Sequence, residues 1–300
     1  MPADVSEVKT RSGFVALAGR PNVGKSTLAN ALVGARVAIV SDKPQTTRRA
    51  IRGVASGPDW QLVLVDLPGV QRPRDALTSR MQRRVEHELA EADGCLFVVS
   101  AQQGIGPGDH FIARLLRSAP TWTVIAVNKT DAADRARTVA TLSAAAQLGI
   151  SDHIFPVSAR TGAGIAPLAQ TLTELLPPGP FYFESRQQTD QAQSVLIAEL
   201  VREQVLRLTR EEVPHAVEVE VTEIEPADAV VRIEAVILTE TESQKGILIG
   251  AGGRMIRAIG TAARRAIERE LEARIHLDLT VRTRRHWRAD ERLLDRLGIE

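Results

Sequence analysis

The chain has 300 residues, of which 44% are hydrophobic, and a formal net charge of +1. This length predicts about two domains, with enough apolar material for a core in each. The small net charge excludes a uniformly basic surface, so a polyanionic partner has to bind a local patch. No apolar run approaches the ~18 residues of a membrane span, and the polar residues 1–12 predict a flexible N-terminus without a signal peptide.

Short apolar strands alternate with amphipathic helices through the predicted first domain, residues 13–178. This alternation predicts an α/β fold, a mostly parallel sheet with helices on both faces, which binds ligands at the carboxyl ends of its strands. The lone cysteine, Cys95, is predicted to be a buried core residue, and a chain with one cysteine fits a reducing cytosol. Strands are expected near 14–19, 50–56, 61–66, 94–100, 122–128 and 153–157, and helices near 25–34, 77–91, 109–118, 134–148 and 164–176.

The segment after the first strand matches the phosphate-loop pattern G-x-x-x-x-G-K-[ST]. Its glycines let backbone N–H groups turn inward at the start of a helix, which makes a site for anions. Lys25 is expected to reach the β- and γ-phosphates, and the Ser26 hydroxyl to bind Mg²⁺. The GTP-binding residues predicted here are Gly19, Arg20, Pro21, Asn22, Val23, Gly24, Lys25, Ser26 and Thr27.

A second buried strand ends on Asp66. With the three residues after it, Asp66 forms an Asp-x-x-Gly element that is also predicted to bind GTP: Asp66, Leu67, Pro68 and Gly69. Asp66 can hold the metal through water, and the Gly69 N–H can face the γ-phosphate. The next residue, Val70, stands where many GTPases have a glutamine that orients the attacking water, so slow intrinsic turnover is expected. Gln71 is expected to be a loop residue pointing elsewhere. Two arginines are candidates, by position only, to neutralise the developing charge: Arg48 and Arg72.

Two later elements predict which base binds. Asp131 can accept hydrogen bonds from guanine N1–H and the 2-amino group, whereas adenine offers neither donor, and such discrimination reaches roughly 10⁴–10⁵. Asn128 is expected to tie the base to neighbouring loops, Lys129 to cover the flat face of the base, and the Ala159 N–H to donate to guanine O6. This element disfavours an ATP-driven RNA enzyme. The predicted base-binding residues are Asn128, Lys129, Asp131, Ser158, Ala159 and Arg160.

A proline-rich stretch, 177–180, ends the first domain, and residues 179–192 are predicted to be a linker. The second domain, 193–300, has the expected order α-β-β-α-α-β. Its helices are predicted near 191–208 and 255–271, with a further helix before the glycine-rich loop at 250–253, and its strands near 216–221, 229–237 and 275–281.

The run from Ile249 to Ile256 fits Ile-Gly-x-x-Gly-x-x-Ile, the signature of KH domains, whose loop clamps single-stranded RNA. Residues 243–288 carry eleven cations and four anions, a net charge of +7, whereas 190–242 carry −9. This polarity favours RNA binding over the alternative, a KH-like protein-docking module. The predicted RNA-binding residues are Lys245, Ile249, Gly250, Ala251, Gly252, Gly253, Arg254, Ile256 and Arg257.

The order of a GTPase domain and a KH domain resembles the Era family of bacterial GTPases over nearly the whole chain. Four stretches carry the resemblance: 19–27, 43–48, 250–253 and 287–292. The resemblance implies a P-loop GTPase domain followed by an α+β type II KH domain, with Thr47, or else Thr46, closing on Mg²⁺ and the γ-phosphate. The predicted catalytic residues are Lys25, Thr47, Asp66 and Gly69, and the predicted metal ligands are Ser26, Thr47 and Asp66.

For function, the resemblance implies GTP hydrolysis, binding near the 3′ end of 16S rRNA, and a role in small (30S) subunit assembly. It also implies a monomeric cytoplasmic protein with a peripheral membrane-associated fraction. Related GTPases with an apolar residue after Asp-x-x-Gly use a phosphate-loop asparagine to hold K⁺, which makes Asn22 a candidate for this second cation. The alternative function is an RNA-binding assembly factor in which GTP is chiefly structural. Ala251 departs from the lysine frequent in family loops.

Overall fold

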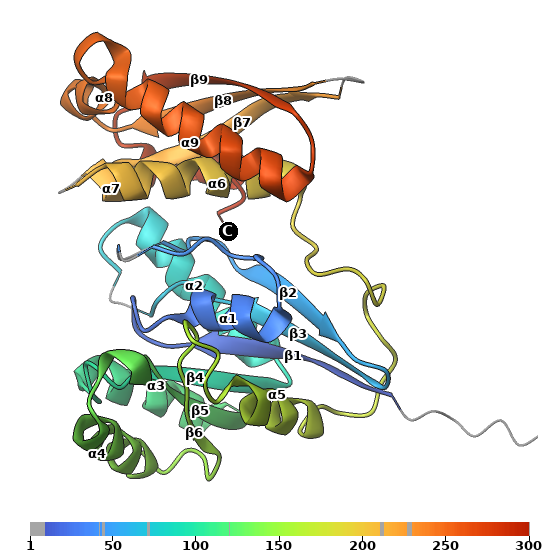
Figure 1. Ribbon diagram of the computed structural model, residues 1–300. Helices are drawn as coiled ribbons and strands as arrows, with labels where there is room; N and C mark the ends of the chain where they lie inside the picture. Colours follow the sequence, from blue (N-terminus) through green and yellow to red (C-terminus); the bar gives the residue numbers. More distant parts are fainter. Residues whose placement is uncertain are drawn as a thin grey trace, which may run out of the picture. The chain divides into compact units, whose positions relative to one another are not determined.

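The computed structural model describes residues 10–41, 43, 46–70, 73–119, 121–210, 213–226 and 230–299. The chain forms two compact units (Figure 1). Unit 1 takes most of the chain up to Asp190, and unit 2 takes the chain from Gln191 onward together with two short segments, Ile39–Thr46 and Arg74–Arg80.

Unit 1 contains one six-stranded sheet in the order β2-β3-β1-β4-β5-β6. Only β2 and β3 pair antiparallel, and the remaining pairs are parallel. The predicted α/β class, a mostly parallel sheet, is therefore confirmed. The strands are β1 (Arg11–Ala18), β2 (Ile51–Ser56), β3 (Trp60–Asp66), β4 (Gly94–Ser100), β5 (Trp122–Asn128) and β6 (Ile154–Pro156), and the helices are α1 (Lys25–Val33), α2 (Ala76–Glu91), α3 (Pro107–Ser118), α4 (Arg135–Ala146) and α5 (Ile165–Glu174).

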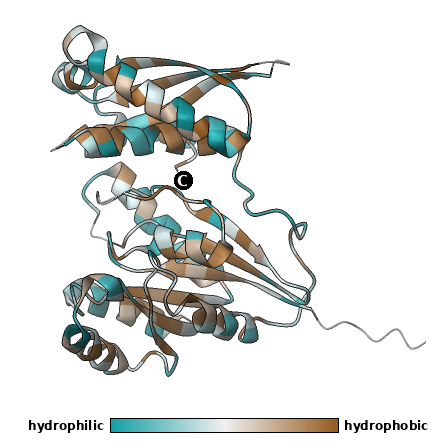
Figure 2. Cartoon of the chain, viewed as in Figure 1, coloured by the Kyte–Doolittle hydropathy of each residue, from teal (hydrophilic) through white to brown (hydrophobic). Residues whose placement is uncertain are grey.

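Apolar side chains of the central strands build a core on each face of this sheet. In β1, Ala16 and Ala18 belong to one core, and Val15 and Leu17 belong to the other, because successive strand residues point to opposite faces. Hydrophobic residues accordingly line the strands in Figure 2. The predicted burial of Cys95 is confirmed: it lies within β4, and burial raises the pKa of its thiol to about 12.

The N-terminal prediction needs a correction. Residues 11 and 12 of the segment predicted to be flexible are strand residues, because the Arg11 N–H donates to Asp59 O at 2.9 Å and β1 pairs with β3 from this point. Residues 1–9 lie outside the described part of the chain.

The segment predicted to be a linker makes contacts with unit 1. Its last part runs along β2, the edge strand of the sheet: the Val54 N–H donates to Gln188 O at 2.8 Å, and the Thr189 hydroxyl donates to Arg52 O at 2.7 Å. Farther back, the Tyr182 ring lies 4.9 Å from that of Phe14, centroid to centroid. Residues of the linker therefore cover one edge of unit 1.

Unit 2 has a three-stranded sheet in the order β7-β8-β9, with β7 and β8 antiparallel and β8 and β9 parallel. Two long helices pack on one face of it and enclose the core (Figure 1). This is the expected α-β-β-α-α-β order of a type II KH domain, with a short helix added before β7. The elements are α6 (Gln193–Leu208), α7 (Val213–Ala216), β7 (Glu218–Glu225), β8 (Val231–Thr239), α8 (Glu242–Ile249), α9 (Arg254–Leu271) and β9 (Ile275–Thr283).

A C-terminal turn and helix that were not predicted complete unit 2. Trp287 is fully buried, and its indole N–H donates to Ala216 O at 2.9 Å. A short helix, α10 (Glu291–Arg296), follows, and the Asp290 side chain caps it by accepting from the Leu293 N–H at 3.1 Å. The segment around Trp287 therefore anchors the end of the chain to this unit.

Candidate nucleotide site and nucleic-acid interface

The phosphate loop joins β1 to α1 at the carboxyl end of the parallel strands. Gly24 has left-handed backbone angles (φ 95°) and precedes the first helical residue, Lys25. The Lys25 ammonium donates to the carbonyl oxygens of Gly19 and Arg20, both at 3.2 Å. Burial lowers the pKa of Lys25 to about 8, and the negative charge of Asp66 opposes this shift. A buried cation at a helix N-terminus is the arrangement that attracts a polyphosphate.

Two further residues of the phosphate loop are distinguished by side-chain direction, in Arg20, and by backbone conformation, in Asn22. The Arg20 guanidinium points away toward α3, where its Nε lies 2.8 Å from the buried Asp109 carboxylate and another nitrogen donates to Gly104 O at 3.0 Å. Only the backbone of Arg20 is thus left to contact phosphates. Asn22 takes left-handed angles (φ 60°), a conformation that asparagine tolerates better than most residues.

Three oxygen-bearing side chains meet next to the loop. The Ser26 hydroxyl donates to Asp66 Oδ2 at 2.6 Å and lies 3.0 Å from the Thr47 hydroxyl, which itself donates to Asp66 Oδ2 at 3.2 Å. Two hydroxyls and one carboxylate are hard oxygen donors that suit Mg²⁺. Thr46 instead donates to Lys43 O at 2.6 Å. The geometry therefore favours Thr47 over Thr46 as the threonine of the metal site.

The Asp-x-x-Gly element packs tightly against the phosphate loop. A Cβ on Gly69 would lie 2.8 Å from backbone atoms of Pro21, so this approach requires glycine. Leu67 is fully buried, and Val70 is 5% exposed and packs in the same core. Val70 therefore cannot orient a water molecule.

The candidates for replacing the missing glutamine are placed as follows. Arg48 is buried. Gln71 and Arg72 lie outside the described residues.

Asn128 links the phosphate loop to the loop after β6. Its amide nitrogen donates to Val23 O at 3.0 Å, and its amide oxygen accepts from the Ala159 N–H at 3.0 Å. The Ala159 N–H was expected to donate to guanine O6, but in this structure it donates to the Asn128 side chain instead. Lys129 has left-handed angles (φ 64°), which end the strand and turn the chain toward Asp131.

The Asp131 carboxylate is held on both sides. Oδ1 accepts from the Ser158 hydroxyl at 2.6 Å, and Oδ2 lies 2.5 Å from the exposed Arg160 guanidinium. The Ser158 hydrogen bond, and then the charge of Arg160, lower the pKa of Asp131, although partial burial opposes them. An ionised carboxylate is what two N–H donors of guanine require.

The loop of unit 2 is built from left-handed glycines. Gly250, Gly252 and Gly253 have φ values of 68°, 60° and 75°, and a Cβ on Gly250 would lie 2.8 Å from Met255. Arg257 donates to Gly252 O at 2.5 Å, so a guanidinium lies directly beside the loop. Lys245 lies 3.8 Å from Glu242 within α8.

Beside this loop lies a cleft of about 370 Å³ between α9 and β9. Its cationic and apolar lining suits a phosphate backbone with stacked or packed bases. Of its lining residues, Ile256 and Arg257 were predicted from the sequence and the others were not, although helical spacing from 257 gives 260, 261 and 264. The lining residues are Ile256, Arg257, Gly260, Thr261, Arg264, Leu277 and Leu279.

Fold and site together define a P-loop guanine-nucleotide-binding protein with a KH domain. Residues 14–129 match the family described as 50S ribosome-binding GTPase, and residues 212–288 match the KH domain family. GTPase Era of Mycobacterium avium (strain 104) is 45% identical over 96% of this chain and 99% of its own. The Mycobacterium tuberculosis protein (strain H37Rv) is equally identical over 96% of this chain and 98% of its own. The chain belongs to the Era GTPase family.

Two solved structures agree over the full length. An Era variant of Aquifex aeolicus bound to GDP and aluminium fluoride is 33% identical, with a TM-score of 0.93 and coverage of 97% of this chain and 99% of the other. An Era complex with MgGDPNP and nucleotides 1506–1542 of 16S ribosomal RNA is 34% identical, with the same TM-score and coverage. The predicted fold and GTPase activity are therefore confirmed.

Proposed function

We propose that this GTPase binds 16S rRNA through unit 2 and assists assembly of the small (30S) ribosomal subunit, with GTP controlling the binding. The observation that carries the proposal is the left-handed glycine loop Gly250–Gly253 next to a cationic cleft, in the same chain as a guanine-nucleotide site. The related Era structure with MgGDPNP and a segment of 16S rRNA supports it.

In this function, unit 1 positions GTP and neutralises its charge. Lys25 and the backbone N–H groups at the start of α1 would bind the phosphates, and the Gly69 N–H would face the γ-phosphate. Ser26, Thr47 and Asp66 would hold Mg²⁺, which supplies positive charge between the β- and γ-phosphates. Because Val70 is buried and apolar, this chain lacks the usual glutamine, and slow intrinsic hydrolysis follows.

We propose that a potassium ion held by Asn22 neutralises the negative charge that develops during GTP hydrolysis. Asn22 is the one non-glycine residue of the phosphate loop with left-handed backbone angles, and a cation held here would act as an arginine finger does. We expect faster GTP hydrolysis in K⁺ than in Na⁺ at equal ionic strength, and loss of this difference in Asn22→Ala. Equal rates in the two salts contradict the proposal and direct attention to Arg48, Arg72 or the ribosome.

RNA binding by the glycine loop is tested with Gly252→Asp. The new carboxylate would stand where phosphates must approach, so we expect RNA binding to be lost while GTP binding persists. Gly149→Asp is the matched control, since Gly149 also has left-handed angles (φ 61°) and open space around it, but lies in unit 1. RNA affinity that survives Gly252→Asp with an unchanged salt dependence would show that the loop is only a structural turn.

The second candidate function is an RNA-binding assembly factor in which GTP is chiefly structural. Buried Val70 favours it, because slow hydrolysis makes a poor switch. The two functions differ in one measurement, the affinity for 16S rRNA with a GTP analogue and with GDP bound. A switch requires different affinities, since a nucleotide that does not change RNA affinity shifts no population. Equal affinities favour the structural role.

We further propose that the protein is a cytoplasmic monomer with a peripheral membrane-associated fraction. The ribosomal partner and the buried thiol Cys95 support a cytoplasmic location. In the described part of the chain, no helix has the length and apolar character to cross a bilayer. Cell fractionation with and without a salt wash tests the membrane fraction, and light scattering tests the oligomeric state.

A further inference from the structure

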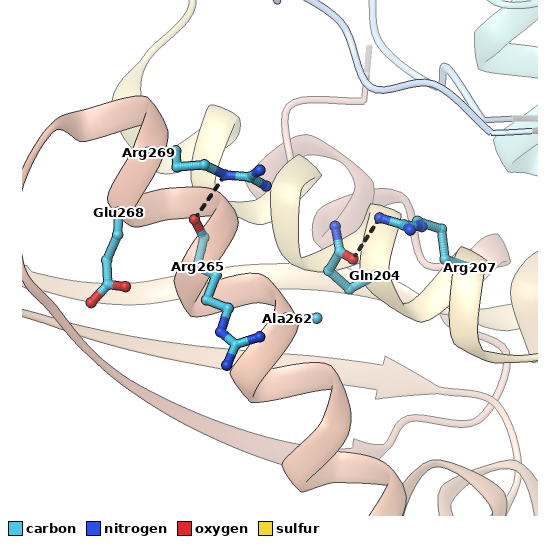
Figure 3. A pocket seen from close by; sticks show the side chains of 6 residues that line it. All are labelled: Gln204, Arg207, Ala262, Arg265, Glu268 and Arg269. Atoms are coloured by element: carbon cyan, nitrogen blue, oxygen red, sulfur yellow. Dashed lines mark hydrogen bonds between the residues drawn. The ribbon is translucent and has the colours of Figure 1, made fainter.

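A second pocket in unit 2 lies between α6 and α9, apart from the RNA cleft described above. Its volume is about 500 Å³ (Figure 3). α6 contributes Gln204 and Arg207, and α9 contributes Ala262, Arg265, Glu268 and Arg269. The lining thus has three guanidinium groups, one carboxylate and no aromatic side chain, so its charge is positive.

The three arginines lack carboxylate partners among the described residues. Arg207 donates to the Gln204 side-chain oxygen at 3.4 Å, and Arg269 Nε donates to Arg265 O at 3.2 Å. Glu268 accepts from the Ile275 N–H at 3.3 Å, and in Figure 3 its carboxylate points away from Arg269. Three guanidinium groups outnumber the one carboxylate of the lining, and an anion in the pocket would reduce the repulsion among them.

The pocket and the RNA cleft use two different sides of α9. Residues turn by about 100° each along an α-helix, so the consecutive residues Arg264 and Arg265 diverge, Arg264 toward the cleft and Arg265 toward α6. Twelve residues separate Gly253 from Arg265, which is about 18 Å along the axis. A KH loop clamps about four nucleotides. RNA held in the cleft therefore needs further nucleotides to reach the pocket.

We propose that this pocket is a second phosphate-binding site, which holds the backbone of RNA flanking the segment clamped by the Gly250–Gly253 loop. The inference rests on the RNA-binding function proposed above. Guanidinium groups offer paired N–H donors that match phosphate oxygens. A protein partner is disfavoured, because the cores of protein interfaces are enriched in aromatic side chains, and the lining of this pocket has none.

The test uses the double variant Arg265→Gln/Arg269→Gln in the full chain. Its matched control is Arg232→Gln/Arg282→Gln, which removes the same charge from exposed positions on strands β8 and β9. Binding is measured at several salt concentrations to two fragments of the 16S rRNA 3′ end, one of about four nucleotides and one extended several-fold on both sides.

We expect the double variant to bind the long RNA about tenfold more weakly, with a salt dependence reduced by about 0.7 per lost phosphate contact. The short RNA and the control variant should bind as the unmodified protein does. Three results overturn the proposal: unchanged binding of the long RNA, equal weakening for both lengths, or arginine-dependent binding to phosphatidylglycerol vesicles instead of RNA. If the unmodified protein binds neither RNA, the RNA-binding function itself fails, and this site with it.

Discussion

Replacing Asp131 by asparagine should exchange guanine for xanthine specificity. The carboxylate is kept ionised by the Ser158 hydroxyl at 2.6 Å and by the Arg160 guanidinium at 2.5 Å, so both of its oxygens can accept hydrogen bonds from a base. Hydrogen bonds to a charged group contribute about 1.5–3 kcal/mol each. Asparagine keeps one acceptor oxygen, so the variant loses one of the two bonds to guanine, which amounts to about 1.5–3 kcal/mol, or a factor of roughly 10–10² in GTP affinity.

The variant should gain affinity for xanthosine triphosphate, because the new amide N–H can donate to the 2-carbonyl of xanthine. Binding competition between GTP and xanthosine triphosphate measures both changes. Asp134→Asn is the control: Asp134 caps α4 by accepting from the Arg137 N–H at 2.7 Å, so its replacement should leave base choice unchanged. An Asp131→Asn protein that still prefers GTP would refute the assignment of this carboxylate to base recognition.

Two further predictions concern the metal site and the C-terminal anchor. Thr47→Ala should remove the extra GTP affinity gained on adding Mg²⁺, whereas Thr46→Ala should retain it. GTP titrations of both variants with Mg²⁺ and with EDTA measure this affinity gain. Equal behaviour of the two variants contradicts the assignment of Thr47 to the metal site. Trp287→Phe leaves the buried Ala216 carbonyl without its donor and should lower the free energy of unfolding by about 1–3 kcal/mol. Urea unfolding measures this, and stability equal to that of a Trp60→Phe control would contradict it.

The sequence predicted those parts of the site that follow local rules. A glycine before Lys25 and a carboxylate at the end of a buried strand are set by strand–turn–helix geometry, so their positions at one edge of the sheet could be anticipated. The choice between Thr46 and Thr47 could not, because it depends on the path of an irregular segment. Nor could the turn of Arg20 toward Asp109, which requires two loops distant in sequence to be neighbours.

The same limit applied to unit 2. The glycines of the RNA loop stand out in the sequence because only they adopt left-handed angles readily. Leu277 and Leu279 of the cleft belong to a strand in which apolar and polar residues alternate over its whole length. Nothing in their spacing indicates that this part of the strand, and not another, lines the cleft beside α9. Sequence alone therefore found the loop and missed the cleft wall.

The end of the linker, which runs along β2, affects how the isolated GTPase domain would behave in solution. An uncovered edge strand offers unpaired N–H and C=O groups to other chains, which is a common origin of aggregation. Here Gln188 and Thr189 satisfy groups on Val54 and Arg52. A protein cut after residue 178 would expose this edge and tend to self-associate, whereas one that ends after Asp190 keeps its own cover.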